Sequence, residues 1–220
     1  MQIQLPKGKF KCIVADPPWP YDTTVKGAHA MPSNLIKDGS RRMVSVSDFT
    51  YPTMSMADII SMPVQDVAES DAGIFLWTTN SFMRQAYDVM DAWGFNPKTI
   101  ITWAKTQHAD PTKASMKQGW WFRGATEHAI FGVRGKLKRQ STKAFPTALL
   151  LPRIYQHSRK PDAFFAMVEV VLPGPRLELF ARRTRPGWTA WGNQINQDTR
   201  AGLCGVPRYS TQPKKHVGWV

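Results

Sequence analysis

The segment Asp16-Pro17-Pro18-Trp19-Pro20 constrains the fold more than any other part of the chain, because it directly follows the apolar run at residues 10–15. A short continuous apolar run is typical of a buried central strand. Proline has no N–H to donate and fixes φ at about −65°, so this segment allows neither strand pairing nor helix. The sequence therefore predicts that Asp16 lies at the carboxyl end of a buried strand.

Short apolar runs alternate along the rest of the chain with segments of helical periodicity. Such alternation is typical of an α/β protein with a mainly parallel, doubly wound sheet. We expect helices at 55–61 with Ser55 as N-cap, at 80–94 with Asn80 or Ser81 as N-cap and Gly94 at the end, and from Pro161 onward. The expected strands are residues 10–15, 73–77, 99–103, 128–133, 177–180 and 189–191, and long loops are expected at 21–50 and 104–126.

Side chains that could bind a ligand or take part in a reaction follow several of these strands. In a doubly wound sheet, ligands bind beyond the carboxyl ends of the strands. The residues expected at that edge are Asp16, Trp77, Lys105 and Arg182.

The composition favours a globular, basic protein. Hydrophobic residues make up 42% of the chain, and 29 Lys plus Arg against 16 Asp plus Glu give a formal charge of +13. This charge favours a polyanionic partner such as nucleic acid, although a solvated basic surface is the ordinary alternative. The two cysteines and five histidines lack the spacing of a metal site, so none is predicted.

The pattern predicts a single domain at residues 1–196 followed by a basic, polar tail at 197–220. No apolar run reaches the roughly 20 residues that cross a bilayer, and the start has no signal-peptide core. We therefore expect a cytoplasmic protein with no membrane partner.

The Asp-Pro-Pro-Trp pattern suits chemistry on the amino group of a base. The lone pair of such a nitrogen is delocalised into the ring, so a catalyst must accept its hydrogen bonds to make it nucleophilic. The Asp16 carboxylate and a rigid Pro17 carbonyl can do this together, with Pro18 fixing the backbone, and Trp19 offers a face for an extruded base. A plain proline-rich turn is the alternative, but the tetrapeptide is rare in random sequence. The predicted catalytic residues are Asp16, Pro17, Pro18 and Trp19.

With further motifs in the same order, the chain resembles the MTA-type adenine-N6 methyltransferases, a family that includes the messenger-RNA adenosine methyltransferase. The similarity covers residues 10–195. Its motifs are FKCIVADPPW at 10–19, YPTMS at 51–55, FLWTTN at 75–80, ITWAKT at 101–106, EHAIFGVRG at 127–135, HSRKPD at 157–162, LELFAR at 177–182 and WGNQ at 191–194.

This resemblance implies a Rossmann-like fold in circularly permuted order, with the catalytic strand first and the cofactor strand last. It also implies S-adenosylmethionine as cofactor. The implied cofactor-binding residues are Asp16, Lys160, Glu178, Arg182, Asn193 and Gln194. The implied substrate-binding residues are Trp19 or Tyr21 for stacking on the base, with Tyr51, Glu127 and Lys105.

Each implied residue also has an ordinary explanation. Lys160 suits a solvated helix start, Glu178 a half-exposed strand position, and Arg182 a basic loop, while residues 193–194 suit a plain turn. Only the joint pattern favours the functional interpretation.

The Asp16 carboxylate favours adenine, with cytosine-N4 as the alternative target because its amino group poses the same chemical problem. An inactive nucleic-acid-binding subunit is a further alternative, against which the presence of both Asp16 and Lys160 argues. The compact size favours a bacterial or phage enzyme acting on DNA rather than RNA. We also expect a homodimer, and sequence preference set by the loops at 22–50 and 104–126 or by a partner.

Overall fold

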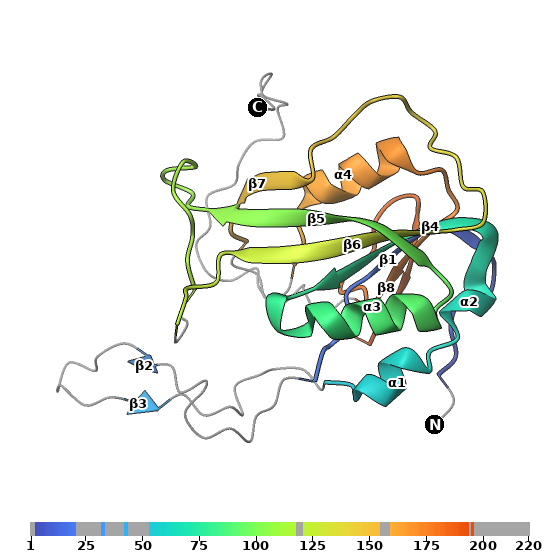
Figure 1. Ribbon diagram of the computed structural model, residues 1–220, viewed down its shortest axis with the longest axis horizontal. Coiled ribbons are helices and arrows are strands. Elements are labelled where there is room, and N and C mark those ends of the chain that lie inside the picture. The colour runs from blue at the N-terminus through green and yellow to red at the C-terminus, as the bar shows by residue number, and fades with distance from the viewer. Residues whose placement is uncertain are drawn as a thin grey trace.

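The computed structural model describes residues 3–20, 32–33, 42–43, 53–117, 121–154, 159–193 and 195 (Figure 1). Its main sheet has the strand order β7-β5-β6-β4-β1-β8-β9. All neighbouring strands are parallel except that β6 is antiparallel to β4 and β5, so the predicted mainly parallel sheet is confirmed. The strands are β1 (Phe10–Ala15), β4 (Ala68–Thr78), β5 (Asn96–Thr106), β6 (Thr126–Arg134), β7 (Ala148–Pro152), β8 (Arg176–Leu179) and β9 (Trp188–Trp191).

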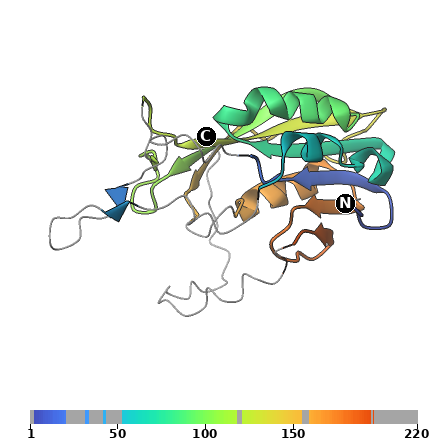
Figure 2. The ribbon, with the colours of Figure 1, turned by 90° about the horizontal axis from the view of Figure 1, so that it is seen from below.

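Helices cover both faces of the sheet, as a doubly wound fold requires. Helix α3 (Met83–Ala92) lies on one face and α4 (Asp162–Val171) on the other (Figure 2). Alternate residues of β1 enter the two apolar clusters, with Ile13 on the α3 side and Val14 on the α4 side. The central strand is therefore buried on both faces from Cys12 to Ala15, which explains the apolar sequence there, whereas Lys11 before it is exposed. Two short helices, α1 (Met56–Ile60) and α2 (Val64–Val67), precede β4.

Local sequence signals located several elements correctly. The predicted strand at residues 10–15 has those bounds, and Ser55 is the N-cap of α1, where its Oγ accepts a hydrogen bond from the Asp58 N–H at 3.1 Å. Pro161 is the N-cap of α4. Gly94 follows α3 with φ +77°, a left-handed conformation in which glycine ends a helix.

Other predictions were wrong in detail. Residues 80–82 form a 3₁₀ turn (Asn80–Phe82), and the N-cap of α3 is Phe82, without a side-chain cap bond. The strands at β4, β5 and β6 are longer than predicted, so the loop expected at 104–126 is correspondingly shorter. Helix α2 and strand β7 were not predicted.

In the loop expected at 21–50, the described residues form a small antiparallel pair, β2 (Pro32–Ser33) with β3 (Arg42–Met43). The remainder of that loop and the predicted tail at 197–220 lie outside the described residues. The division into a domain at 1–196 and a tail thus stays a prediction.

Strand register determines which residues meet at the carboxyl edge. Ala15 of β1 pairs with Leu76 of β4 on one side and with Leu179 of β8 on the other. The next residues along the three strands, Asp16, Trp77 and Phe180, therefore lie at one level. Strands from opposite ends of the sequence meet here, which is the kind of position where doubly wound folds bind ligands.

Candidate active site

The Asp-Pro-Pro-Trp segment is fastened by backbone hydrogen bonds instead of regular strand pairing. The Asp16 N–H donates to the Leu179 carbonyl at 3.5 Å, and the Trp19 N–H to the Pro17 carbonyl at 2.9 Å. The Pro18 carbonyl accepts the Met54 N–H, also at 2.9 Å. Each proline carbonyl still has a second lone pair, so the Pro17 oxygen is both fixed and able to accept another donor.

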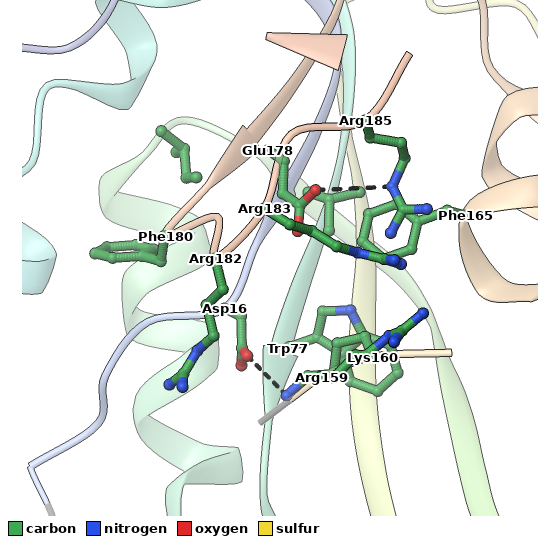
Figure 3. A pocket seen from close by; sticks show the side chains of 12 residues that line it. Asp16, Trp77, Arg159, Lys160, Phe165, Glu178, Phe180, Arg182, Arg183 and Arg185 are labelled. Atoms are coloured by element: carbon green, nitrogen blue, oxygen red, sulfur yellow. Dashed lines mark ion pairs between the residues drawn. The ribbon is translucent and has the colours of Figure 1, made fainter. Parts of the chain in front are cut away.

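Four charged side chains form a continuous network behind this segment. Lys160 Nζ lies 2.7 Å from Asp16 Oδ2 and 3.1 Å from Glu127 Oε2, and Glu127 also pairs with Lys105. Negative and positive groups alternate along the network, so every described member has an opposite charge beside it. Figure 3 shows the ion pair between Asp16 and Lys160 at the pocket.

These ion pairs keep Lys160 and Glu127 charged despite their burial. Burial alone would lower the pKa of Lys160, but the carboxylates of Asp16 and Glu127 outweigh it and raise that pKa. Burial alone would raise the pKa of Glu127, but Lys160 and Lys105 outweigh it and bring the pKa to about 2. For Asp16, burial exceeds the pull of Lys160, and its pKa is raised. Asp16 is thus a better proton acceptor than an ordinary aspartate.

A tryptophan ring lies beneath the ammonium group of each of the two lysines. Lys160 Nζ lies 5.2 Å from the ring centroid of Trp77, and Lys105 Nζ lies 4.6 Å from that of Trp103. Both distances suit cation–π attraction. Because both rings are buried in the core, they limit the movement of the lysine side chains.

A pocket opens beside this network at the carboxyl ends of β1 and β8. It encloses about 480 Å³, including the part open to solvent. Figure 3 shows Glu178 reaching into it from β8, with the arginines of the following loop around it. Its lining residues include Asp16, Trp77, Lys160, Phe165, Glu178 and Phe180, and the arginines Arg159, Arg182, Arg183 and Arg185.

Glu178 has a buried carboxylate oxygen in this pocket. Its Oε2 atom is buried and accepts no hydrogen bond from any residue that the structure describes. Arg185 Nε is 3.9 Å away, which allows attraction but not a hydrogen bond. Burial raises the pKa of Glu178 to about 7, against the opposing effect of Arg185. A buried carboxylate oxygen that lacks a donor indicates a place for a ligand hydroxyl or N–H.

Backbone strain occurs at the same place. Phe180, the residue after β8, has φ +62°, a conformation that bulky residues rarely adopt. Its ring packs edge-on against Trp191 at a centroid distance of 5.6 Å. Strained residues persist where packing holds them, and they gather at ligand sites.

Asp162 holds the arginine rim together. Its carboxylate accepts hydrogen bonds from Arg159 at 2.8 Å and Arg185 at 3.0 Å, and it also pairs with Arg183. Burial would raise the pKa of Asp162, but these arginines lower it. The rim nevertheless keeps an excess of positive charge, which suits an anionic substrate.

The structure brings together many of the residues predicted from sequence. Asp16, Lys160, Glu178 and Arg182 line one pocket, and Glu127 and Lys105 join it through the ion network. The exposed Asn193 is not part of the pocket lining. The roles assigned to all these residues stay predictions, and three predicted residues lie outside the described part of the chain: Tyr21, Tyr51 and Gln194.

Trp19 occupies a different environment from the one expected. Its side chain is only 4% exposed, stacks on Phe82 at a centroid distance of 5.5 Å, and donates its indole N–H to the Trp77 carbonyl at 3.1 Å. Because the ring fills the core, it presents almost no surface to a base. These contacts attach the Asp-Pro-Pro-Trp segment to β4 through Trp19.

The pocket lining includes residues that were not predicted as site residues, among them Phe165, Arg159, Arg183 and Arg185. The basic run after β8 was the available signal for two of them, but a charge run alone does not distinguish a pocket rim from a solvated loop. Over the described ranges, no cluster of three metal-ligating side chains occurs, and no helix is long and apolar enough to span a membrane.

Comparisons with known proteins identify the family of this chain. The sequence model of the MT-A70 family matches residues 10–194. The type II methyltransferase M.MunI of Mycoplasma sp. is 31% identical over 199 residues, which are 87% of this chain and 80% of that protein. The human METTL3 catalytic subunit of N(6)-adenosine-methyltransferase is 26% identical over 86% of this chain but only 29% of its own length. An MT-A70-like N(6)-adenosine-methyltransferase of Arabidopsis thaliana is 28% identical, with 24% of its length covered.

Proposed function

The chain belongs to the MT-A70 family of N6-adenine methyltransferases, and from this premise we propose that it methylates the N6 amino group of adenine in DNA with S-adenosylmethionine as donor. The observation that supports this most strongly is the position of the Asp16 carboxylate. It lies at the pocket, beside the fixed Pro17 carbonyl and 2.7 Å from Lys160.

The pocket fits the cofactor that this family uses. The buried Glu178 Oε2, for which no donor lies among the described residues, suits a ribose hydroxyl, and Arg182 lines the same wall. The pair of Asp16 with Lys160 presents both charge signs, which suits the ammonium and carboxylate of an amino acid. When bound, S-adenosylmethionine supplies an electrophilic methyl group on a sulfonium.

Asp16 and Pro17 act on the amino group. Their two oxygens accept its two N–H donors, which localises the nitrogen lone pair and orients it. When the nitrogen is alkylated, its surplus proton becomes acidic and passes to the Asp16 carboxylate. The raised pKa of Asp16 supports this acceptance.

Glu127 and Lys105 position Lys160. Without Glu127, Lys160 would have Asp16 alone as its carboxylate partner in the network and would be drawn toward it. With Glu127 held by Lys105, the lysine is shared, and an oxygen of Asp16 remains available to the substrate. We also propose that Glu127 contacts the adenine base.

One observation favours DNA over RNA. M.MunI, named a type II methyltransferase, aligns with this chain over 80% of its length, whereas the METTL3 match covers 29% of that protein. The formal charge of +13 suits either polyanion. We further propose that the active form is a homodimer, to be tested by sedimentation.

The test is a tritiated-methyl transfer assay on unmodified DNA and RNA, with Asp16→Ala as the inactive variant and Lys98→Ala, at an exposed position near the amino end of β5, as the matched control. We expect label in DNA from the wild-type protein and the control only, recovered as N6-methyladenine after digestion to nucleosides. Label only in RNA would correct the substrate, and N4-methylcytosine would correct the base. If calorimetry detected no S-adenosylmethionine binding, the inactive-subunit alternative would replace the enzyme.

A further inference from the structure

Two large aromatic side chains on the β5–β6 connection are almost completely exposed. Trp121 is 86% exposed and Phe122 is 90% exposed, the highest values among large apolar side chains within the described ranges. Leu150 follows at 68%. Adjacent exposed aromatic residues leave apolar surface in water, and such surface marks an interaction site.

The connection is anchored to the candidate active site. Lys105 donates its backbone N–H to the Ala125 carbonyl at 2.8 Å and accepts the Ser115 N–H at 2.7 Å, so both arms of the connection bond to this one residue. The side chain of Lys105 pairs with Glu127 in the ion network. Lys105 therefore links the connection that carries the aromatic pair to the candidate active site, and this connection leaves the carboxyl end of β5 (Figure 1).

The surroundings of the pair are basic. Lys117 precedes the pair in the sequence and Arg123 follows it; both are exposed, and the Lys117 N–H donates to the Gly124 carbonyl at 2.7 Å. Cations suit the phosphates of nucleic acid, and planar rings suit its bases. Another protein would be expected to meet an apolar patch with a mixed polar rim instead.

We propose that Trp121 and Phe122 form a wedge that fills the space left in a DNA duplex when the target adenine is extruded toward Asp16. This inference rests on the proposed function. Extrusion breaks base pairing and stacking on both sides of the adenine, and aromatic side chains inserted there restore part of the stacking. Lys117 and Arg123 then bind the neighbouring phosphates.

The experiment compares two duplexes with the double variant W121A/F122A. One duplex has the target adenine paired with thymine, in a sequence that the wild-type protein methylates. The other has an abasic site opposite the same adenine, which makes extrusion easier. L150A is the matched control, since it removes an exposed apolar side chain from the edge strand β7.

We expect W121A/F122A to lose at least about tenfold in kcat/KM on the paired duplex and to come within about threefold of wild type on the abasic duplex. L150A should match wild type on both. Equal losses on the two duplexes would show that the pair only binds DNA, and no loss would remove its role; either result overturns the wedge. A fall from dimer to monomer in sedimentation, with activity restored at high protein concentration, would assign the surface to a second copy and also overturns it. If the wild-type protein methylated adenine in no DNA, so that such a duplex could not be found, the proposed function itself would be refuted.

Discussion

Replacing Lys160 with methionine tests the electrostatics of the site. The substitution removes the cation that lies 2.7 Å from Asp16 and 3.1 Å from Glu127. With an effective dielectric constant of about 20, these separations correspond to attractions of about 6 and about 5 kcal/mol, most of which desolvation offsets. Removing one partner of a buried ion pair typically costs about 3–5 kcal/mol. We expect Lys160→Met to lower the free energy of unfolding by that amount at pH 8.

The loss should depend on pH in a defined direction. Without Lys160, burial raises the pKa of Asp16 further, and the pKa of Glu127 rises from its wild-type value of about 2. The folded variant then binds protons more readily than the unfolded chain, so its deficit shrinks as the pH falls.

Urea titrations of wild type and variant at pH 8 and pH 5 measure this difference, with Lys113→Met as an exposed control within about 0.5 kcal/mol of wild type. A deficit below about 1 kcal/mol, or one equal at both pH values, would refute the reasoning.

Three further predictions concern stability. Because burial raises the pKa of Glu178 from 4.5 to about 7, the free energy of unfolding should fall by up to about 3 kcal/mol as the pH rises between these values. In urea titrations, Glu178→Gln should remove this dependence of the free energy of unfolding on pH. An unchanged pH dependence in the variant would contradict the assignment to Glu178. Ser55→Ala should cost about 1 kcal/mol in thermal melts by removing the N-cap bond of α1, with methyl transfer unchanged. Gly135→Ala should cost about 1–3 kcal/mol, since Gly135 has φ +64° and an added Cβ would lie 2.3 Å from the Ser70 carbonyl oxygen; a neutral result would show that this turn relaxes.

Sequence patterns predicted those elements whose signals are local. The apolar run of β1, the Ser55 cap and the Pro161 helix start depend on a few neighbouring residues, so they were visible in the chain. Helix α2, with four residues, and the edge strand β7, with five, are too short to establish a period. The prediction that Asn80 or Ser81 caps α3 was wrong because residues 80–82 form a 3₁₀ turn before the helix. In that turn, Phe82 stacks on Trp19.

The site was predictable in its position but not in its connections. That Asp16 ends a central strand followed from the prolines, and Lys160 and Glu178 came from the family resemblance. The bridge from Asp16 through Lys160 to Glu127 joins β1, the start of α4 and β6, and no spacing in the sequence encodes it. The burial of Trp19 likewise depends on partners 58 and 63 residues further along the chain, Trp77 and Phe82.

The most direct test of a catalytic role for Asp16 is single-turnover methyl transfer by Asp16→Asn, with cofactor and DNA both saturating so that binding losses do not enter. The amide keeps the size of the side chain but removes the charge that orients the amine and accepts its proton. We expect a rate lower than that of wild type by about 100-fold or more. A rate within a few-fold of wild type would contradict it, because the carboxylate would then have no part in the chemistry.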